Sequence, residues 1–548
     1  MPGRPISTAL VVSLLAAATA AQDPHSHHGA TEMLGTVHFP VSCAEEVRPE
    51  FTRAVALLHS FGYEESRNAF ADVARRDPAC GIASWGIAMT YYHPIWAPPT
   101  AGDLALGRAA AETAAKVGAK TERERAYIDA IGLFYRDSDK VDHRTRALAY
   151  RTALEEMTRR DPNDHEASIF FALMLVGTAP PADSTLANQK RAAEILNGML
   201  EQEPQHPGVA HYLIHAFDYP TLAPLAVPAA RSYAKIASSS PHALHMPSHI
   251  FTRLGLWQES IESNLASAEA ARRSVAKNHP GSASFDALHA LDYLEYSYLQ
   301  IGDEDRAKQV LDEAAGASSF DEPNFAAGYA LTAIPARFAL ERRRWLDAGR
   351  LEVSQAKLPW ENFRYATAIT YFARALGSAR AGQAEPARAA IARLAELQAG
   401  LVQNPIPGPY DWASQVESMR RAAAAWIAYS EGRKEEALEL ARAAADLDDK
   451  TGKHPVTPGS VLPPRELLGD LLREMGRNAD ALVEYESGLR SAPNRFNSLF
   501  GAARAAELAG NEAKAREHYG QLLANCSKSG SGAERQEIRQ ARAFTKPS

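Results

Sequence analysis

The chain has 548 residues and a mild formal net charge of −7, from 59 Lys and Arg against 66 Asp and Glu. A chain of this length exceeds one ordinary core, so several domains or an extended repeat array are expected. The sequence pI near 6.2 and the absence of a long basic block argue against a nucleic-acid partner, which would favour a basic surface. Plentiful alanine and the lack of long β-branched runs favour helices over sheets.

The first 20 residues, 1–20, predict a secretory signal peptide. Arg4 supplies the positive start, residues 8–18 are apolar, and Ala18-Thr19-Ala20 fits the small-residue cleavage pattern. This apolar stretch is shorter than the roughly 20 residues that span a bilayer, although an uncleaved anchor is the alternative. We therefore expect export to a periplasm or the cell exterior, with no membrane span after cleavage and a disordered entry segment over 21–46.

Three cysteines occur in the sequence. Cys43 precedes the first expected helix, and Cys80 follows Asp77-Pro78 at a later helix boundary. In an oxidising compartment these two can form a disulfide. A metal–thiolate site needs more soft ligands nearby, and the sequence offers none. We expect the Cys43–Cys80 disulfide, with Cys526 free.

A repeat with a period of 34 residues is plain near the C-terminus. Gly476 begins the run GRNADA and Gly510 begins the run GNEAKA, and Tyr485 and Tyr519 are also 34 residues apart. The glycine permits a tight turn between two helices, and the following alanine lets these helices pack closely. A proline such as Pro493 ends the second helix of a unit. Similar units recur along most of the chain.

In period and residue pattern this sequence resembles the tetratricopeptide-repeat family, as an exported, bacterial-type member. The resemblance covers roughly residues 47–525 and is weakest at 95–230. It implies an all-α, right-handed α-solenoid of about ten helix-turn-helix repeats. A composition shift near 313–328 suggests two sub-arrays, 47–315 and 316–548. In this family the first helix of each pair lines a concave groove, which implies a protein, peptide or small-molecule partner.

Histidines gather on three successive first helices. Residues six, ten and thirteen before the turn of each pair share the groove face. Counting back from Gly255, from Gly302 and from a turn near Thr221 places a polar set on this face: His211, His215, His242, His245, His249, His289, Asp292 and Tyr296. Asp218 reaches the edge of the same face.

These histidines suggest a metal site. Neighbouring helices pack about 8–10 Å apart, so their imidazoles can converge on one ion. Neutral imidazoles suit zinc, copper or iron, and Asp292 or Asp218 can act as an oxygen ligand or orient a histidine. Pro247 interrupts the HxxxH pair His245/His249. The alternative is that the histidines only bond a peptide or are satisfied buried groups.

Further groove residues are expected upstream and downstream. His59 and His93 end the first helices of the first two pairs, and Arg337 can meet an anionic ligand. The proline-rich connector at 454–464 is either a linker or a flap across the groove. The tract of His25, His27 and His28 can bind metal weakly.

The leading functional hypothesis is an exported scaffold whose groove binds a protein, peptide or small ligand, with a histidine-bound transition metal. The rival is a metal-dependent enzyme, a hydrolase or oxygenase, with its site at 211–296 and Tyr296 or Asp292 assisting. A third hypothesis is a groove whose histidines respond to pH. The sequence has no P-loop, GxSxG or HExxH motif.

Overall fold

Paired antiparallel helices make up the protein, each pair packed on the next along the chain. The computed structural model describes residues 1, 32–95, 98–181, 183–408, 410–531 and 534–546. Within these residues every regular element is a helix, and the only β contact is an isolated bridge between Ala283 and Phe320. The expected all-α repeat fold is confirmed. Apart from Met1, the predicted signal peptide lies outside the described residues.

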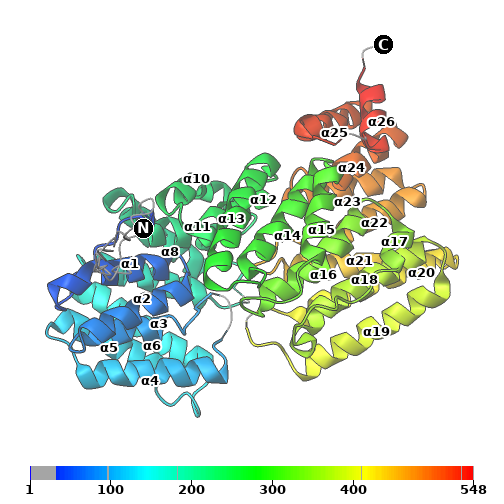
Figure 1. Cartoon of the computed structure of the whole chain (residues 1–548). Coiled ribbons are helices and arrows are strands. Elements are labelled where there is room, and N and C mark those ends of the chain that lie inside the picture. Colours follow the sequence, from blue (N-terminus) through cyan, green and yellow to red (C-terminus); the bar gives the residue numbers. More distant parts are fainter. Residues whose placement is uncertain (2–31, 96–97, 182, 409, 532–533, 547–548) are drawn as a thin grey trace. The chain divides into compact units, whose positions relative to one another are not determined.

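The helices of the N-terminal half run from α1 to α13 (Figure 1). Their bounds are η1 Glu45–Val47, α1 Arg48–His59, α2 Tyr63–Arg76, α3 Gly81–Met89, α4 Ala101–Val117, α5 Glu122–Tyr135, α6 His143–Arg160, α7 His165–Gly177, α8 Ala187–Gln202, α9 Pro207–Phe217, η2 Ala223–Ala226, α10 Val227–Ile236, α11 Pro241–His245, α12 Pro247–Arg253 and α13 Trp257–Asn278. Pairs form here even where the repeat pattern of the sequence is degenerate.

The C-terminal half continues the same alternation. Its helices are α14 Phe285–Gln300, α15 Glu304–Ala315, α16 Phe325–Glu341, α17 Trp345–Gly349, η3 Trp360–Asn362, α18 Arg364–Arg380, α19 Ala384–Gln403, α20 Trp412–Ser430, α21 Lys434–Thr451, α22 Pro464–Glu474, α23 Asn478–Ser491, α24 Phe496–Leu508, α25 Glu512–Asn525, η4 Cys526–Lys528 and α26 Gln536–Thr545. Gly476 and Gly510 turn between paired helices with φ of +77° and +76°, a conformation that glycine adopts without strain.

Buried apolar side chains form three clusters along the chain. The first runs from Leu34 to Phe251, the second from Trp257 to Ala505, and the third from Phe496 to Ala541. The second cluster has members on both sides of residues 315 and 316, where the sequence suggested a division between sub-arrays. Each helix pair therefore buries its apolar face mainly against its neighbours.

The segment before the first helix differs from the expected disorder of residues 21–46. Leu34, Val37 and Phe39 are buried, and the Thr36 amide donates to the carbonyl of Gln205 at 2.9 Å. The expectation was wrong for residues 33–44, because their apolar side chains fill the surface left at the start of the helical array. The structure joins Cys43 at the end of this segment to Cys80.

One pair departs from simple helix geometry. Its first member is split into α11 and α12 at Met246, directly before Pro247. Proline suits the first turn of a helix but cannot donate the backbone bond that continues one. His245 therefore ends one short helix and His249 lies in the next. Within the described residues, no helix combines the length and the apolar character needed to cross a membrane.

Two glycines inside helices give a test of how tightly these pairs are packed. A Cβ on Gly501 of α24 would lie 2.4 Å from the buried Tyr485 ring, whereas a Cβ on Gly520 of α25 would meet nothing within 4 Å. We expect Gly501→Ala to lower the free energy of unfolding by about 1–3 kcal/mol through overpacking. Gly520→Ala should raise it by up to about 1 kcal/mol through helix propensity.

Urea denaturation of the two variants beside the parent chain measures both effects. Equal effects of the two substitutions would contradict this close approach of α24 to Tyr485.

Candidate metal centre

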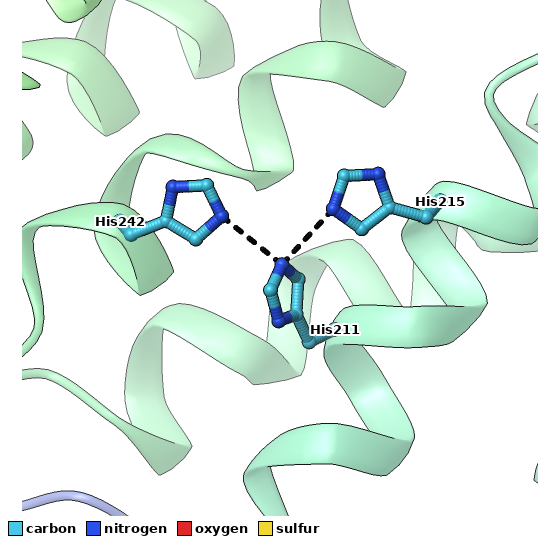
Figure 2. Close-up of side chains that lie close together, drawn as sticks. All are labelled: His211, His215 and His242. Carbon is cyan, nitrogen blue, oxygen red and sulfur yellow. Dashed lines mark hydrogen bonds between the residues drawn. The ribbon is translucent and has the colours of Figure 1, made fainter. Parts of the chain in front are cut away.

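Two histidines of α9 and one of α11 form a first trio: His211, His215 and His242. The Nε2 atom of His211 lies 3.1 Å from the Nε2 atoms of both other rings. Figure 2 shows the three imidazoles directed toward one another, two from one helix and the third from the facing helix. All three side chains are buried.

A second trio lies beside the first: His245 at the end of α11, His249 in α12 and His289 in α14. The Nε2 atoms of His245 and His249 are 3.1 Å apart despite the helix break between them. The ring of His289 lies 4.2 Å from that of His245, centre to centre. Within each trio, one ligand nitrogen from every ring lies within 4.8 Å of the others.

Three of the six rings have their other nitrogen, Nδ1, bonded to an oxygen that can only accept. His211 Nδ1 lies 2.7 Å from the carbonyl oxygen of His59, and His249 Nδ1 lies 3.2 Å from a carboxylate oxygen of Asp218. His245 Nδ1 lies 2.7 Å from Asn264 Oδ1, whose amide nitrogen donates elsewhere. Nδ1 must therefore carry the proton in all three rings.

A proton on Nδ1 leaves a bare lone pair on Nε2, because a neutral imidazole has one donor and one acceptor. His245 and His249 thus face each other with two lone pairs and no proton between them. Burial lowers the pKa of His245 well below its usual range and also lowers that of His249. Near neutral pH neither ring therefore takes up a second proton, on Nε2. Two facing lone pairs repel each other, whereas a cation between the rings would attract both of them.

The spacing fits metal coordination. Transition metals bind imidazole nitrogen at about 2.0–2.1 Å, and two nitrogens 3.1 Å apart then subtend about 98° at the ion. This angle is close to the tetrahedral value. Burial also lowers the pKa of His211, His215, His242 and His289 well below the usual range. All six rings are neutral and ready to act as ligands.

Asp218 anchors the edge of the second trio. Its carboxylate accepts from His249 and from Arg253 Nε at 2.8 Å, and the Lys453 ammonium donates to it at 2.8 Å. Burial alone would raise the pKa of Asp218, but Lys453 and Arg253 hold this pKa well below its usual range. Asp218 therefore stays ionised and orients His249, which is one of the roles expected for it.

Residues 452–463, between α21 and α22, cover the second trio and are called the covering loop. Lys453 reaches Asp218, and Tyr293 of α14 donates to the carbonyl oxygen of Val456 at 3.1 Å. Tyr329 donates to Gly459 at 3.3 Å. The connector is thus a flap and not a simple linker. The expected open, histidine-lined groove is wrong here, since no ring of either trio is more than 9% exposed.

Asp292, Tyr296 and Arg337 do not join the histidines. Arg337 is fully buried and donates to Asp292 at 2.7 Å and to Glu295 at 3.1 Å. Tyr296 accepts a bond of 2.7 Å from Arg495. The expectations of a metal ligand at Asp292 and of groove positions at Tyr296 and Arg337 were wrong, because these side chains find buried partners on neighbouring helices.

His59 orients one histidine of the first trio through its backbone carbonyl. Its ring is buried and bonds Glu166 through Nε2 at 2.9 Å, while its carbonyl orients His211. His206 also bonds Glu166, at 3.0 Å. His93 instead stacks on Tyr63 and lies 3.1 Å from the carbonyl of Thr90. Neither His59 nor His93 lines an open groove, because His59 is buried against α7 and α9 and His93 stacks on Tyr63 at the start of α2.

Four contributing residues were not expected from the sequence. Asn264 lies on the second helix of its pair, and Lys453 comes from a loop 235 residues beyond Asp218. Tyr293 and Glu166 also support the trios. Only Asn264 could have been found from the sequence, because it is a polar residue between Ser260 and Ser267 on the face of α13 that is buried.

Comparison with known proteins gives no assignment. No family model and no curated protein matches the chain. A monomeric IFIT1 mutant with Gppp-AAAA aligns over 88% of this chain and 96% of its own, at 12% identity and a TM-score of 0.38. Human IFIT1 dimer with m7Gppp-AAAA aligns over 81% and 90%, at 11% identity and 0.38. Yeast Tom70 aligns over 91% and 95%, at 10% identity and 0.32. Likenesses this weak carry no argument about function.

Removing the Asp218 carboxylate tests the anchor of the second trio. Asp218→Ala leaves Lys453 and Arg253 without their shared, buried counter-charge. We expect a loss of about 3–5 kcal/mol in the free energy of unfolding, measured by urea denaturation. The surface variant Glu156→Gln, which breaks exposed ion pairs with Arg159 and Arg160, should cost no more than about 1 kcal/mol. Similar losses in both variants would contradict the buried anchor.

Proposed function

We propose that this protein is a metalloprotein that binds transition-metal ions through the two histidine trios. One observation carries the proposal: His245 and His249 turn unprotonated Nε2 atoms toward each other at 3.1 Å, while their Nδ1 protons point outward to fixed oxygen acceptors. A buried polar cluster without a cation would leave these lone pairs unsatisfied at a cost in stability. Zinc, copper and iron all accept imidazole ligands.

The coordination number favours a reactive site over a purely structural one. Each trio supplies three nitrogens, whereas a structural tetrahedral site is closed by four protein ligands. A metal held by three imidazoles keeps a position for water or another small ligand. This supports a metal-dependent enzyme at 211–296 as the second candidate, without the assistance expected from Asp292 or Tyr296.

A scaffold role for a protein or peptide partner is proposed only for surfaces away from the trios. Both trios are buried and the covering loop lies over the second one, so a peptide cannot contact the histidines in this structure. The array of helix pairs offers other extended surfaces for such a partner. For the same reason the third hypothesis, a pH-responsive groove, finds less support than metal binding.

Metal analysis of protein purified without an affinity tag tests the proposal. We expect bound zinc, copper or iron, up to one ion for each trio, in the parent chain. His215→Ala/His249→Ala removes one ligand from each trio and should lose most of this metal. The matched variant His165→Ala/His279→Ala, which alters histidines outside the trios, should keep it.

A third variant, with His25, His27 and His28 changed to alanine, removes the N-terminal histidine tract as a source of bound metal. Equal metal in the parent and in the variant lacking His215 and His249, or no metal in any of them, would sink the metalloprotein proposal.

Export is proposed on two grounds. The N-terminal sequence fits a cleavable signal, and a disulfide such as Cys43–Cys80 persists in oxidising compartments. We expect the intact mass of the chain recovered from a periplasm or culture medium to correspond to a start near Ala21 with the disulfide closed. A full-length mass, or two free thiols at these positions, would contradict this.

A further inference from the structure

The two trios are neighbours and not separate sites. Ring centres of His215 and His249 are 6.3 Å apart, and those of His242 and His245 are 6.4 Å apart. These distances between trios match the 6.1 Å between His249 and His289 inside the second trio. The rings on either side of the boundary between the trios are therefore only slightly farther apart than the most widely spaced pair within the second trio.

Two ions held by such trios share one chamber. His249 lies between the trios, since its ring centre is 6.3 Å from that of His215 in the first trio and 5.0 Å from that of His245 in the second. Among the residues that the structure describes, neither trio includes a carboxylate that could bridge two ions. A bridge between the ions must then come from a small exogenous ligand.

The charge of the surroundings limits which ions fit. All six ligands are neutral. The ionised groups around them are Asp218 with its two cations, Arg253 and Lys453, and the Glu166 carboxylate behind the first trio. These four groups carry no net charge together, so the surroundings do not offset the charge of bound cations. Two dications without an anionic ligand are costly in such a place. Ions of low charge, or ions that acquire a bridging anion, are favoured.

Copper meets both conditions. Copper(II) binds nitrogen ligands more tightly than the other divalent first-row metals. Its reduced state carries a single positive charge, and three imidazoles suffice as its ligands. Dinuclear iron sites in helical proteins are built largely with carboxylates, and neither trio contains one.

We propose that the two trios hold a pair of copper ions in one chamber, and that the reduced pair binds dioxygen as a single bridging ligand. Each cuprous ion gives one electron and becomes cupric. Dioxygen accepts both electrons and becomes a peroxide dianion between the ions. No proton and no outside reductant are needed, and the total charge of the chamber is unchanged. The proposal rests on the proposed metal-binding function.

The covering loop sets the size of what can enter. Lys453, Val456 and Gly459 of this loop bond Asp218, Tyr293 and Tyr329 above the second trio. The side chains of the trios are 0–9% exposed. A diatomic molecule can reach such a chamber by small fluctuations, whereas a peptide or sugar cannot. Dioxygen fits this restriction.

The test loads the full chain, lacking the N-terminal His25, His27 and His28, with an acetonitrile complex of copper(I) under nitrogen. Copper content, oxygen uptake after admission of air, and the electron paramagnetic resonance signal of copper(II) are then measured. We expect two copper ions per chain, uptake of one dioxygen per two copper ions, and loss of the copper(II) signal through coupling across the bridge.

Two matched variants each disable one trio: His242→Asn in the first and His289→Asn in the second. Each should bind one copper ion per chain, which also shows that it is folded. After oxidation its copper should be fully visible by paramagnetic resonance, since an isolated cupric ion has one unpaired electron.

The outcomes separate this inference from the proposed function. Two copper ions that are both visible by paramagnetic resonance, or one ion per chain that requires both trios, would overturn the bridged pair. Zinc bound at both trios with no copper uptake would overturn the choice of copper and leave the metalloprotein proposal standing. No uptake of any of these metals would overturn both.

Discussion

The candidate centre depends on where three protons are held. The carbonyl of His59, the amide oxygen of Asn264 and the carboxylate of Asp218 each accept from the Nδ1 of one histidine. These bonds fix the tautomer of the three rings. The lone pairs of their Nε2 atoms therefore point into the buried interior of the trios. With the rings in this orientation, three other features fit metal binding: the spacing within the trios, the low pKa of the rings, and the covering loop that shields the second trio from solvent.

The repeat architecture allows such a centre to form from regular helix pairs. First helices of successive pairs pack side by side, so α9, α11 with α12, and α14 place histidines of different pairs in contact. The break before Pro247 is the one local departure, and it still leaves His245 and His249 with their Nε2 atoms 3.1 Å apart.

Much of this could be predicted from the sequence, because the repeat is local. The 34-residue spacing of Gly476 and Gly510 predicts the helix pairs, and counting back from the turns places the six histidines on adjacent helices. Counting back from the turns does not predict a side chain's contacts when its hydrogen-bond partner lies on another helix pair or on a loop. Asp292 shares the histidine face by register but bonds the buried Arg337, and Lys453 arrives from a distant loop. Register along one helix carries no information about such contacts.

The most direct measurement of the central claim is anomalous X-ray diffraction from crystals of the untagged protein, recorded at the absorption edge of each bound metal. The account predicts two separate peaks, one within about 2.0–2.1 Å of the Nε2 atoms of each trio. A metal peak bound only elsewhere in the chain, or well-ordered trios with hydrogen-bonded rings and no peak in metal-saturated crystals, would contradict it.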